Sequence, residues 1–307
     1  MRQFIKSILL YIPVCCLSYV LFVCFWGEFV PGAFRTNLAV ENRSENTSMR
    51  LHDVRDYEDI DILFLGSSRA FSHFDTRMYE SLGYSAFNLG TSSQTPVQTK
   101  ILLERYLDVL NPELIIYEVS PSMFSNDGVE SSTDIIANGK CDMASVRMGI
   151  ESRHIKVLNT LIFRLYTKAF KRDTEPESQK LDYDKRYIKG GFLVSEQTKY
   201  KPLKLASPPQ VENLNPNQIK AFESILDMIS TREPGLILFQ VPFARDKYES
   251  HQAINPVFDR QMNQYGRYYN LNETMHLVDT IHFRDEFHLN LTGVSLLNDE
   301  IIDLLSL

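Results

Sequence analysis

Cysteine is scarce in this sequence and basic residues are outnumbered by acidic ones, and each feature argues against a class of protein. Three of the four cysteines, Cys15, Cys16 and Cys24, lie in an apolar run near the amino terminus, which leaves Cys141 alone in the rest of the chain. One thiol cannot form an intrachain disulfide there, and without a Cys/His cluster we predict no metal site and no cofactor. The net charge of −7 argues against nucleic acid as a partner, because phosphate binding needs clustered positive charge.

The length and composition are those of an ordinary globular protein. The chain has 307 residues, of which 44% are hydrophobic and 23% are charged. This is enough for one α/β domain with a sizeable core, or for two small domains. Disorder is not the expectation for any long stretch of such a composition.

The amino terminus carries a long uncharged run. No charged residue occurs from Ser7 to Trp26, which is about enough for a helix to cross a hydrocarbon core of roughly 30 Å. Arg2 and Lys6 precede the run and predict a short cytoplasmic amino end, with the remaining chain outside. A cleaved signal peptide is the competing interpretation, but the run is longer than usual and no small-residue cleavage site follows. We predict an uncleaved, single-pass anchor over residues 1–29 in the cytoplasmic (inner) membrane.

Beyond the anchor, the sequence predicts a polar stalk followed by one domain. Residues 30–58 have little apolar periodicity and are interpreted as the stalk, and residues 59–307 as the domain. Strands alternate with helices there, which predicts a parallel sheet covered on both faces, a three-layer α/β/α fold with ligands at the carboxyl ends of the strands. The predicted strands are 60–65, 85–89, 113–119, 235–241 and 276–279, and the predicted helices are 75–82, 96–110, 216–231, 256–269 and 291–305.

An insertion at about residues 121–215 fits no simple crossover between strands. Residues 142–173 have apolar residues at helical spacing and seven Lys or Arg residues, including Arg153, Lys156, Lys171 and Arg172, against Glu151. They form either a helical cap with a solvated charged face or a surface that meets anionic lipid or an acidic glycan. Residues 174–209 are polar and predict a loop, which could cover the site as a lid.

Two distant segments together predict a nucleophilic site. The apolar run 60–65 ends at Gly66 and is followed by Ser67 and Ser68, which places a serine at the carboxyl end of a buried strand. Asp285 precedes His288 by three residues, so the carboxylate can hold the imidazole while its other nitrogen faces the serine. The alternative is structural, because a serine after a strand often caps a helix and Asp285 could cap the last one.

These segments resemble the SGNH (GDSL-type) hydrolase superfamily, and more closely its membrane-anchored bacterial branch. That branch includes the D-alanyl transfer protein of teichoic acid modification and the O-acetylation proteins of alginate. The resemblance covers roughly residues 58–120 and 232–305. It implies a flavodoxin-like, SGNH-type parallel sheet.

The family motifs assign roles to individual residues. Gly66-Ser67-Ser68 matches the Gly-Asp-Ser motif with Ser67 in place of Asp, so the resemblance implies Ser68 as the nucleophile and leaves Ser67 as the fallback. Gly90 in Ala86-Phe-Asn-Leu-Gly90 matches the oxyanion-hole glycine, which would act with the N–H of Ser68. Asp285 and His288 match the closing Asp-x-x-His motif.

The chain departs from the third family motif, which places an oxyanion-binding asparagine after the third strand. Ser120 stands at that end instead, and losing one such donor can cost about 2.7–4 kcal/mol of transition-state stabilisation. Ser120 or Gln94 could substitute for it. Asn88 either donates to the site or caps the strand end, and Arg69 either forms a structural ion pair or holds an acidic sugar.

The resemblance implies an extracytoplasmic, serine-dependent esterase or O-acyltransferase that acts on a cell-envelope polysaccharide. Water as the second acceptor would make it an esterase, and a sugar hydroxyl would make it an acyltransferase. The alternative is a non-catalytic SGNH-fold binding or scaffolding protein that works beside a membrane-bound O-acyltransferase. A lipase or phospholipase would need an apolar acyl groove that the sequence does not reveal.

Overall fold

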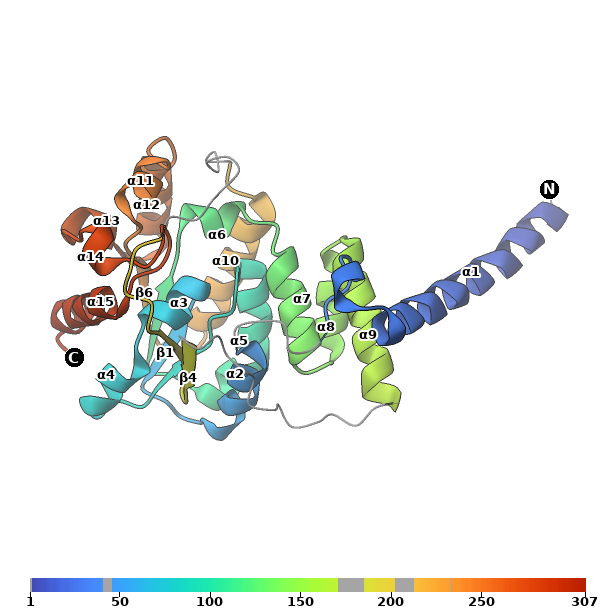
Figure 1. Ribbon diagram of the computed structural model, residues 1–307, viewed down its shortest axis with the longest axis horizontal. Helices are drawn as coiled ribbons and strands as arrows, with labels where there is room; N and C mark the ends of the chain where they lie inside the picture. The colour runs from blue at the N-terminus through green and yellow to red at the C-terminus, as the bar shows by residue number, and fades with distance from the viewer. Residues whose placement is uncertain (1, 41–45, 171–184, 202–212, 233) are drawn as a thin grey trace.

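A parallel sheet of five strands forms the centre of the domain. A computed structural model describes residues 2–40, 46–170, 185–201, 213–232 and 234–307 (Figure 1). The strand order β2-β1-β3-β6-β7 is the flavodoxin-like order once the two strands of a separate hairpin are set aside. This confirms the predicted fold class. The strands are β1 (Ile62–Leu65), β2 (Ala86–Asn88), β3 (Leu114–Glu118), β6 (Gly235–Gln240) and β7 (Arg267–Asn270).

The register of β1, β2 and β3 places their carboxyl ends at one edge of the sheet. Phe64 of β1 pairs with Asn88 of β2 and with Ile116 of β3. Both faces of β1 are buried, which explains why its sequence is continuously apolar rather than alternating. The chain segments that follow β1, β2 and β3 therefore meet at this edge.

Helices cover the two faces of the sheet and form two apolar cores. On one face α5 (Pro96–Leu110), α10 (Pro216–Ser230) and α12 (Asn255–Tyr265) pack against the sheet. On the other face lie α3 (Ser68–His73) and α15 (Leu291–Leu305). Local signals set their ends, as α5 begins at Pro96 after a capping box formed by Thr95 and Gln98. The three-layer prediction is thereby confirmed.

The last predicted strand was wrong. Residues 276–279 lead into the short helix α14 (Asp279–His282), and β7 lies earlier, directly after α12. Tyr268 and Tyr269 of β7 are only half-buried and pair with β6, so contact with the neighbouring strand rather than an apolar run defines this edge strand.

The described part of the insertion contains four helices and a hairpin. The predicted helical spacing appears as α8 (Met143–Glu151) and α9 (Ile155–Phe170). The predicted loop contains the antiparallel strands β4 (Lys185–Ile188) and β5 (Phe192–Ser195), which turn at Gly190 and Gly191 with φ of 91° and 93°. Lys171 and Arg172, and most of the loop, lie outside the described residues.

The hairpin is part of the domain's core rather than a separate cover. Gly190 accepts a hydrogen bond from the Asn88 backbone at 2.8 Å, and Phe192 is fully buried. A Cβ on Gly191 would lie 2.1 Å from the Asn88 carbonyl oxygen, so only glycine allows this approach. A lid role for residues 185–195 is therefore excluded by their packing.

The predicted stalk is also wrong over its second half. Helix α2 (Thr47–Asp53) packs into the core, where Leu51 is 1% exposed. Arg50 is fully buried, donates through Nε and Nη2 to the Gly191 carbonyl at 3.1 and 2.9 Å, and lies over the Phe71 ring. Two polar residues of this segment, Thr47 and Arg50, thus form buried hydrogen bonds. Residues 41–45 lie outside the described residues.

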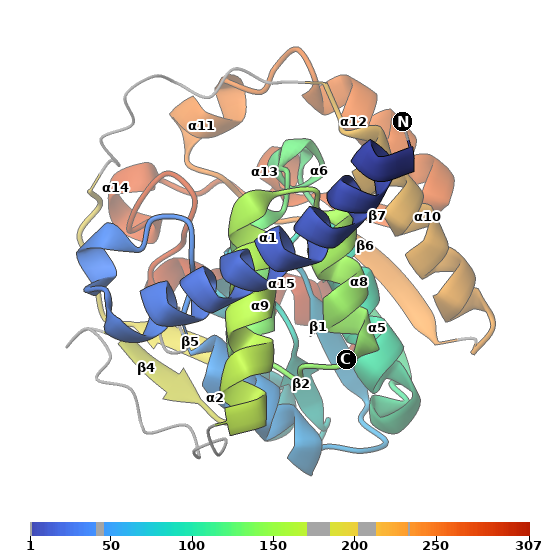
Figure 2. The ribbon, with the colours of Figure 1, turned by 90° about the vertical axis from the view of Figure 1, so that its right-hand side faces the viewer.

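The amino-terminal helix α1 (Arg2–Phe29) projects from the side of the body that carries α8 and α9 (Figure 1). Its segment Tyr11–Phe29 is long and apolar enough to cross a membrane or to be a signal sequence. Figure 2 shows its later part crossing α9. The other helices of the described chain are η1 (Gly32–Phe34), η2 (Val54–Asp56), α4 (Thr76–Ser81), α6 (Pro121–Ser125), α7 (Val129–Asn138), α11 (Arg245–Glu249) and α13 (Leu271–Thr274).

Candidate active site

The turn after β1 separates the roles of the two adjacent serines. Gly66 has φ of 141°, and a Cβ there would lie 2.8 Å from the Cβ of Glu118, so the turn requires glycine. Ser67 is the N-cap of α3: its hydroxyl accepts from the Arg69 N–H at 3.3 Å and donates to Glu118 at 3.0 Å. Ser68 is the first residue of α3 and is half-buried. The hydroxyl of Ser67 is therefore occupied, which leaves the hydroxyl of Ser68 available as a nucleophile.

Ser68, His288 and Asp285 form one hydrogen-bonded chain. The Ser68 Oγ lies 2.9 Å from His288 Nε2. The other ring nitrogen of His288, Nδ1, lies 3.0 Å from each carboxylate oxygen of Asp285. This arrangement of nucleophile, base and orienting carboxylate can support covalent acyl transfer.

The Asp285 carboxylate is held by a tight turn that also carries His288. Its Oδ1 accepts from the backbone N–H of Phe287 at 2.8 Å and of His288 at 2.9 Å. Burial alone would raise the pKa of Asp285, but the hydrogen bonds from His288 and from the Phe287 backbone outweigh it, and the pKa lies below its ordinary value. Asp285 is therefore ionised at neutral pH and can stabilise a protonated imidazole.

Two backbone N–H groups are candidates for the oxyanion hole, and they differ in availability. The Ser68 N–H lies in the first turn of α3, which has no acceptor for it within the helix, and it donates to no other group in the described chain. The Gly90 N–H instead donates to the Asn88 side chain at 3.1 Å. A Cβ on Gly90 would lie 2.8 Å from the Ser67 carbonyl oxygen, so glycine lets this strand end approach the nucleophile turn.

Asn88 is a structural link rather than a substrate contact. Its Nδ2 donates to the Ala70 carbonyl at 2.8 Å and to the Phe74 carbonyl at 3.4 Å, while its Oδ1 accepts from Gly90. It therefore fixes the end of β2 against the end of α3. The sequence allowed Asn88 either to donate to the site or to cap the strand end. The structure agrees with a capping role, but the capped end is that of α3 rather than that of β2.

Neither candidate substitute for the missing asparagine contacts the triad. The Gln94 amide donates to Thr99 Oγ1 at 2.9 Å and accepts from Thr91 Oγ1 at 2.8 Å, which ties it to the start of α5. Ser120 is buried at the start of α6, and its Oγ lies 3.3 Å from that of Ser122. Both side chains are thus engaged within their own turns.

Arg69 belongs to a buried ion pair behind the nucleophile. Its Nη1 lies 3.5 Å from Glu118, its Nη2 donates to the Val241 and Pro242 carbonyls, and its guanidinium stacks 3.4 Å from the Phe243 ring centroid. Burial lowers the pKa of Arg69 to about 10, and Glu118 partly opposes this. With 3% of Arg69 exposed, the structural ion pair is the alternative that the geometry favours over binding of an acidic sugar.

His73 lies near the triad, and its place after the nucleophile turn predicts only a surface or supporting role for it. It is fully buried, its Nε2 accepts from the Leu289 N–H at 3.0 Å, and its ring lies 5.9 Å from that of His288. Burial and the nearby His288 lower the pKa of His73 well below its ordinary value, so the ring stays neutral and can accept. Only the tertiary structure brings it beside Leu289, which lies 216 residues later in the chain.

We expect His73→Leu to destabilise the protein by about 1–3 kcal/mol, because the buried Leu289 N–H would lose its acceptor. His73→Gln should recover much of this loss, since its amide oxygen can replace Nε2. Urea unfolding of both variants measures the difference. Equal stability of the two variants would contradict the assigned hydrogen bond.

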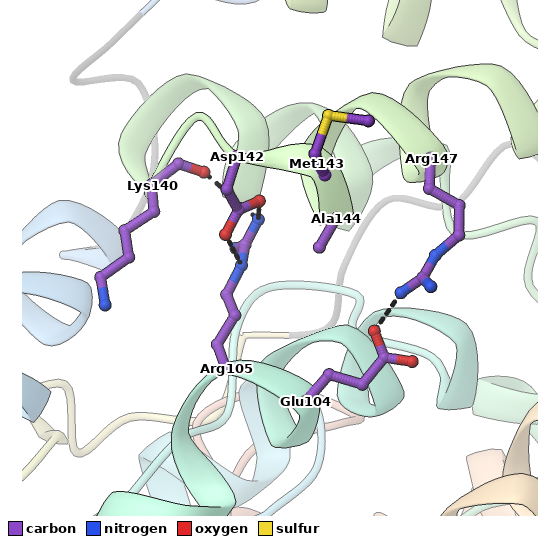
Figure 3. A pocket seen from close by; sticks show the side chains of 7 residues that line it. All are labelled: Glu104, Arg105, Lys140, Asp142, Met143, Ala144 and Arg147. Atoms are coloured by element: carbon purple, nitrogen blue, oxygen red, sulfur yellow. Dashed lines mark hydrogen bonds and ion pairs between the residues drawn. The ribbon is translucent and has the colours of Figure 1, made fainter.

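A polar groove of 560 Å³ lies apart from the triad, between α5 and α8 (Figure 3). Its carboxylates are already paired, because Arg105 binds Asp142 at 2.7 Å and Arg147 binds Glu104. We assign no catalytic role to it. It is lined by Glu104, Arg105, Lys140, Asp142, Met143, Ala144 and Arg147.

No protein-family model and no curated protein matches the chain. Among solved structures, a protein from Bacteroides fragilis described as an acylhydrolase is similar with a TM-score of 0.41 and 10% identity, over 83% of this chain and 93% of that one. A GDSL-like lipase from Bacteroides thetaiotaomicron is similar with a TM-score of 0.44 and 11% identity, over 85% and 97%. Likeness at this level assigns no activity, so the site is argued from its own geometry.

Proposed function

We propose that this chain is a serine-dependent acyl-ester hydrolase or O-acyltransferase with Ser68 as its nucleophile. The observation that carries the proposal is the hydrogen-bonded chain from Ser68 Oγ through His288 to Asp285, at 2.9 and 3.0 Å. The match of Gly66-Ser67-Ser68 and of the Asp285/His288 pair to the family motifs supports it from the sequence.

The proposed reaction has two steps. Ser68 Oγ attacks the acyl carbon while His288 Nε2 takes the hydroxyl proton, and the N–H of Ser68 stabilises the oxyanion. His288 then returns the proton to the departing alcohol, which leaves an acyl-serine. Water, or a sugar hydroxyl, gives a proton to His288 and attacks the acyl carbon, and His288 passes that proton to Ser68 Oγ as the acyl–serine bond breaks. The first acceptor makes an esterase, and the second makes an acyltransferase.

The proposed substrate is an acyl ester of a cell-envelope polysaccharide, and a membrane-bound O-acyltransferase is the proposed partner. Both rest on the resemblance to the membrane-anchored branch. The proposed location is the cytoplasmic membrane of a bacterium, with the domain on the periplasmic or extracellular side. An uncleaved α1 is supported by its contacts, because cleavage after Trp26 would remove the buried Val23 from its cluster with Leu38 and Phe163.

We expect a reporter enzyme that works only outside the cytoplasm to be active when fused to the carboxyl end. The physical reason is the placement of Arg2 and Lys6 before an uncharged span. The measurement pairs this fusion with a second reporter that works only inside. Activity of the second reporter alone, or recovery of a soluble chain without residues 1–26, would contradict the placement.

A specific observation favours a second candidate, a non-catalytic binding or scaffolding protein. The Gly90 N–H is bonded to Asn88, and no asparagine stands directly after β3, so the Ser68 N–H is the one free donor identified for the oxyanion among the described residues. A fluorophosphonate probe separates the two candidates, because an activated serine reacts with it. We expect the wild-type protein to be labelled, whereas a protein that remains unlabelled while folded would support the scaffold.

A further inference from the structure

The length of α1 leaves no spacer between the bilayer and the domain. A helix of 28 residues is about 42 Å long, whereas the hydrocarbon core is about 30 Å thick. Contacts with the domain already begin at Tyr19, whose hydroxyl donates to Asn159 of α9 at 2.5 Å. The stretch before Tyr19 is therefore only about 26 Å long. If α1 spans the membrane, its first contact with the domain lies no farther out than the edge of the hydrocarbon.

The later part of α1 is fixed to α9. Val23 is fully buried against Leu38 and Phe163, which are themselves 0% and 5% exposed. Gly27 allows this close packing, since a Cβ there would lie 2.3 Å from the Phe163 ring. The Arg35 guanidinium also donates to the Gly27 carbonyl at 2.8 Å. The domain is therefore joined rigidly to α1 rather than through a flexible stalk.

The segment that directly precedes Asn159 in the chain exposes apolar side chains that the core does not use. It comprises residues 150–158, named here the α8–α9 turn. Ile150 is 64% exposed, Ile155 48% and Leu158 37%, while Val157 and the preceding Met148 face inward and are buried. Figure 2 shows α1 crossing α9, the helix that carries Ile155 and Leu158.

Cations accompany these apolar side chains. Arg153 and Lys156 form no ion pair within the described chain, and Glu151 is the only acidic residue of the turn. Arg153 has φ of 50°, which closes the turn between the helices and leaves its long side chain exposed. Apolar residues flanked by unpaired cations are the composition that binds at the headgroup region of an anionic bilayer.

We propose that the α8–α9 turn rests on the headgroup surface of an anionic phospholipid bilayer, beside the point where α1 enters it. This rests on the proposed membrane placement of α1, but not on catalysis by Ser68. Ile150, Ile155 and Leu158 enter the boundary between headgroups and acyl chains, and Arg153 and Lys156 contact lipid phosphates. The contact holds the domain directly on the membrane in one orientation.

Depth-dependent fluorescence quenching tests the proposal on the full chain in nanodiscs of phosphatidylcholine and phosphatidylglycerol. Single-cysteine variants carry a small fluorophore, with the other native cysteines replaced by alanine. Ile150→Cys and Ile155→Cys report on the turn. Val278→Cys is the matched control, because residue 278 is 49% exposed and precedes α14, on the far side of the body from α1 (Figure 1). A variant that retains only Cys16 reports on α1 itself.

Lipid-attached nitroxides should quench positions 150 and 155 several-fold more than position 278. Quenching at Cys16 but not at 150 and 155 would overturn the proposal while keeping the anchor. No quenching at Cys16 would overturn both, and neither outcome depends on ester turnover. Protection of position 150 from an aqueous quencher without quenching by lipid would assign the turn to a protein partner and also overturn it.

A separate experiment tests the contact between the two cations and the lipid phosphates. Arg153→Gln combined with Lys156→Gln should lower the quenching at position 150 in nanodiscs that contain phosphatidylglycerol. The same change should have little effect in phosphatidylcholine alone, where no net negative charge attracts the cations. An unchanged signal in both lipids would overturn the selection of anionic headgroups.

Discussion

Ser68→Ala is expected to abolish labelling by a fluorophosphonate probe and to reduce ester turnover by about 10⁶-fold, as removal of the nucleophile does in subtilisin. Ser68 Oγ is the atom that lies 2.9 Å from His288 Nε2, and no other described side chain takes that place. The hydroxyl is half-buried at a turn and contributes little to packing, so the variant should keep its stability. Probe labelling, turnover of a small acetyl ester and thermal unfolding measure the three effects.

Ser67→Ala is the matched control one residue away. Its hydroxyl caps α3 and bonds to Glu118, so its loss should cost about 0.5–2 kcal/mol of stability. Labelling should persist at Ser68. Full labelling of Ser68→Ala together with loss in Ser67→Ala would show that the two serines have been assigned the wrong way round.

Asp285→Asn is expected to reduce ester turnover by about 10⁴-fold, the cost of the corresponding change in chymotrypsin-type proteases. The amide oxygen of asparagine can keep the bonds from the Phe287 and His288 backbones, so the turn should survive. The carboxylate that holds the correct His288 tautomer is lost. Comparison of kcat/KM for the two proteins, at equal fold content by circular dichroism, measures the effect.

The pH dependence of turnover follows from the same pair. A histidine must be neutral to accept the serine proton, so turnover should be lost towards acid pH. Asp285 has a lowered pKa and stays ionised at neutral pH. The contribution of ionised Asp285 to the stability of the folded protein is present above the ordinary carboxyl pKa. It is lost only as the pH falls through the lowered pKa that Asp285 has in the folded state. A flat profile, or a fully active His288→Ala protein, would remove His288 from the mechanism.

The turn from Asp285 to His288 shows what short-range chemistry can predict. Three residues separate the carboxylate from the imidazole, so their mutual bond depends on one local turn that the sequence makes visible. A serine after an apolar run and a glycine is likewise a local signal for a strand end. The parallel sheet was predictable for the same reason, because strands buried on both faces are continuously apolar.

Other assignments depended on partners far along the chain. Arg50 was expected in a polar stalk, but Gly191, 141 residues later, accepts its buried hydrogen bonds. The Gly90 N–H was expected to face the oxyanion, and it donates to Asn88. β7 is defined by its pairing with β6 rather than by its own pattern.

The sequence by itself determined the class of fold and the local halves of the site, because apolar runs, turn residues and an i,i+3 pair act over a few residues. Only the tertiary structure decided which polar groups are occupied and which are free. It ties Ser67 to Glu118, Arg69 to Glu118 and Asn88 to α3, and it leaves Ser68 beside His288. The physical reason is that a buried polar group must find a partner, and that partner is set by packing between segments distant in sequence.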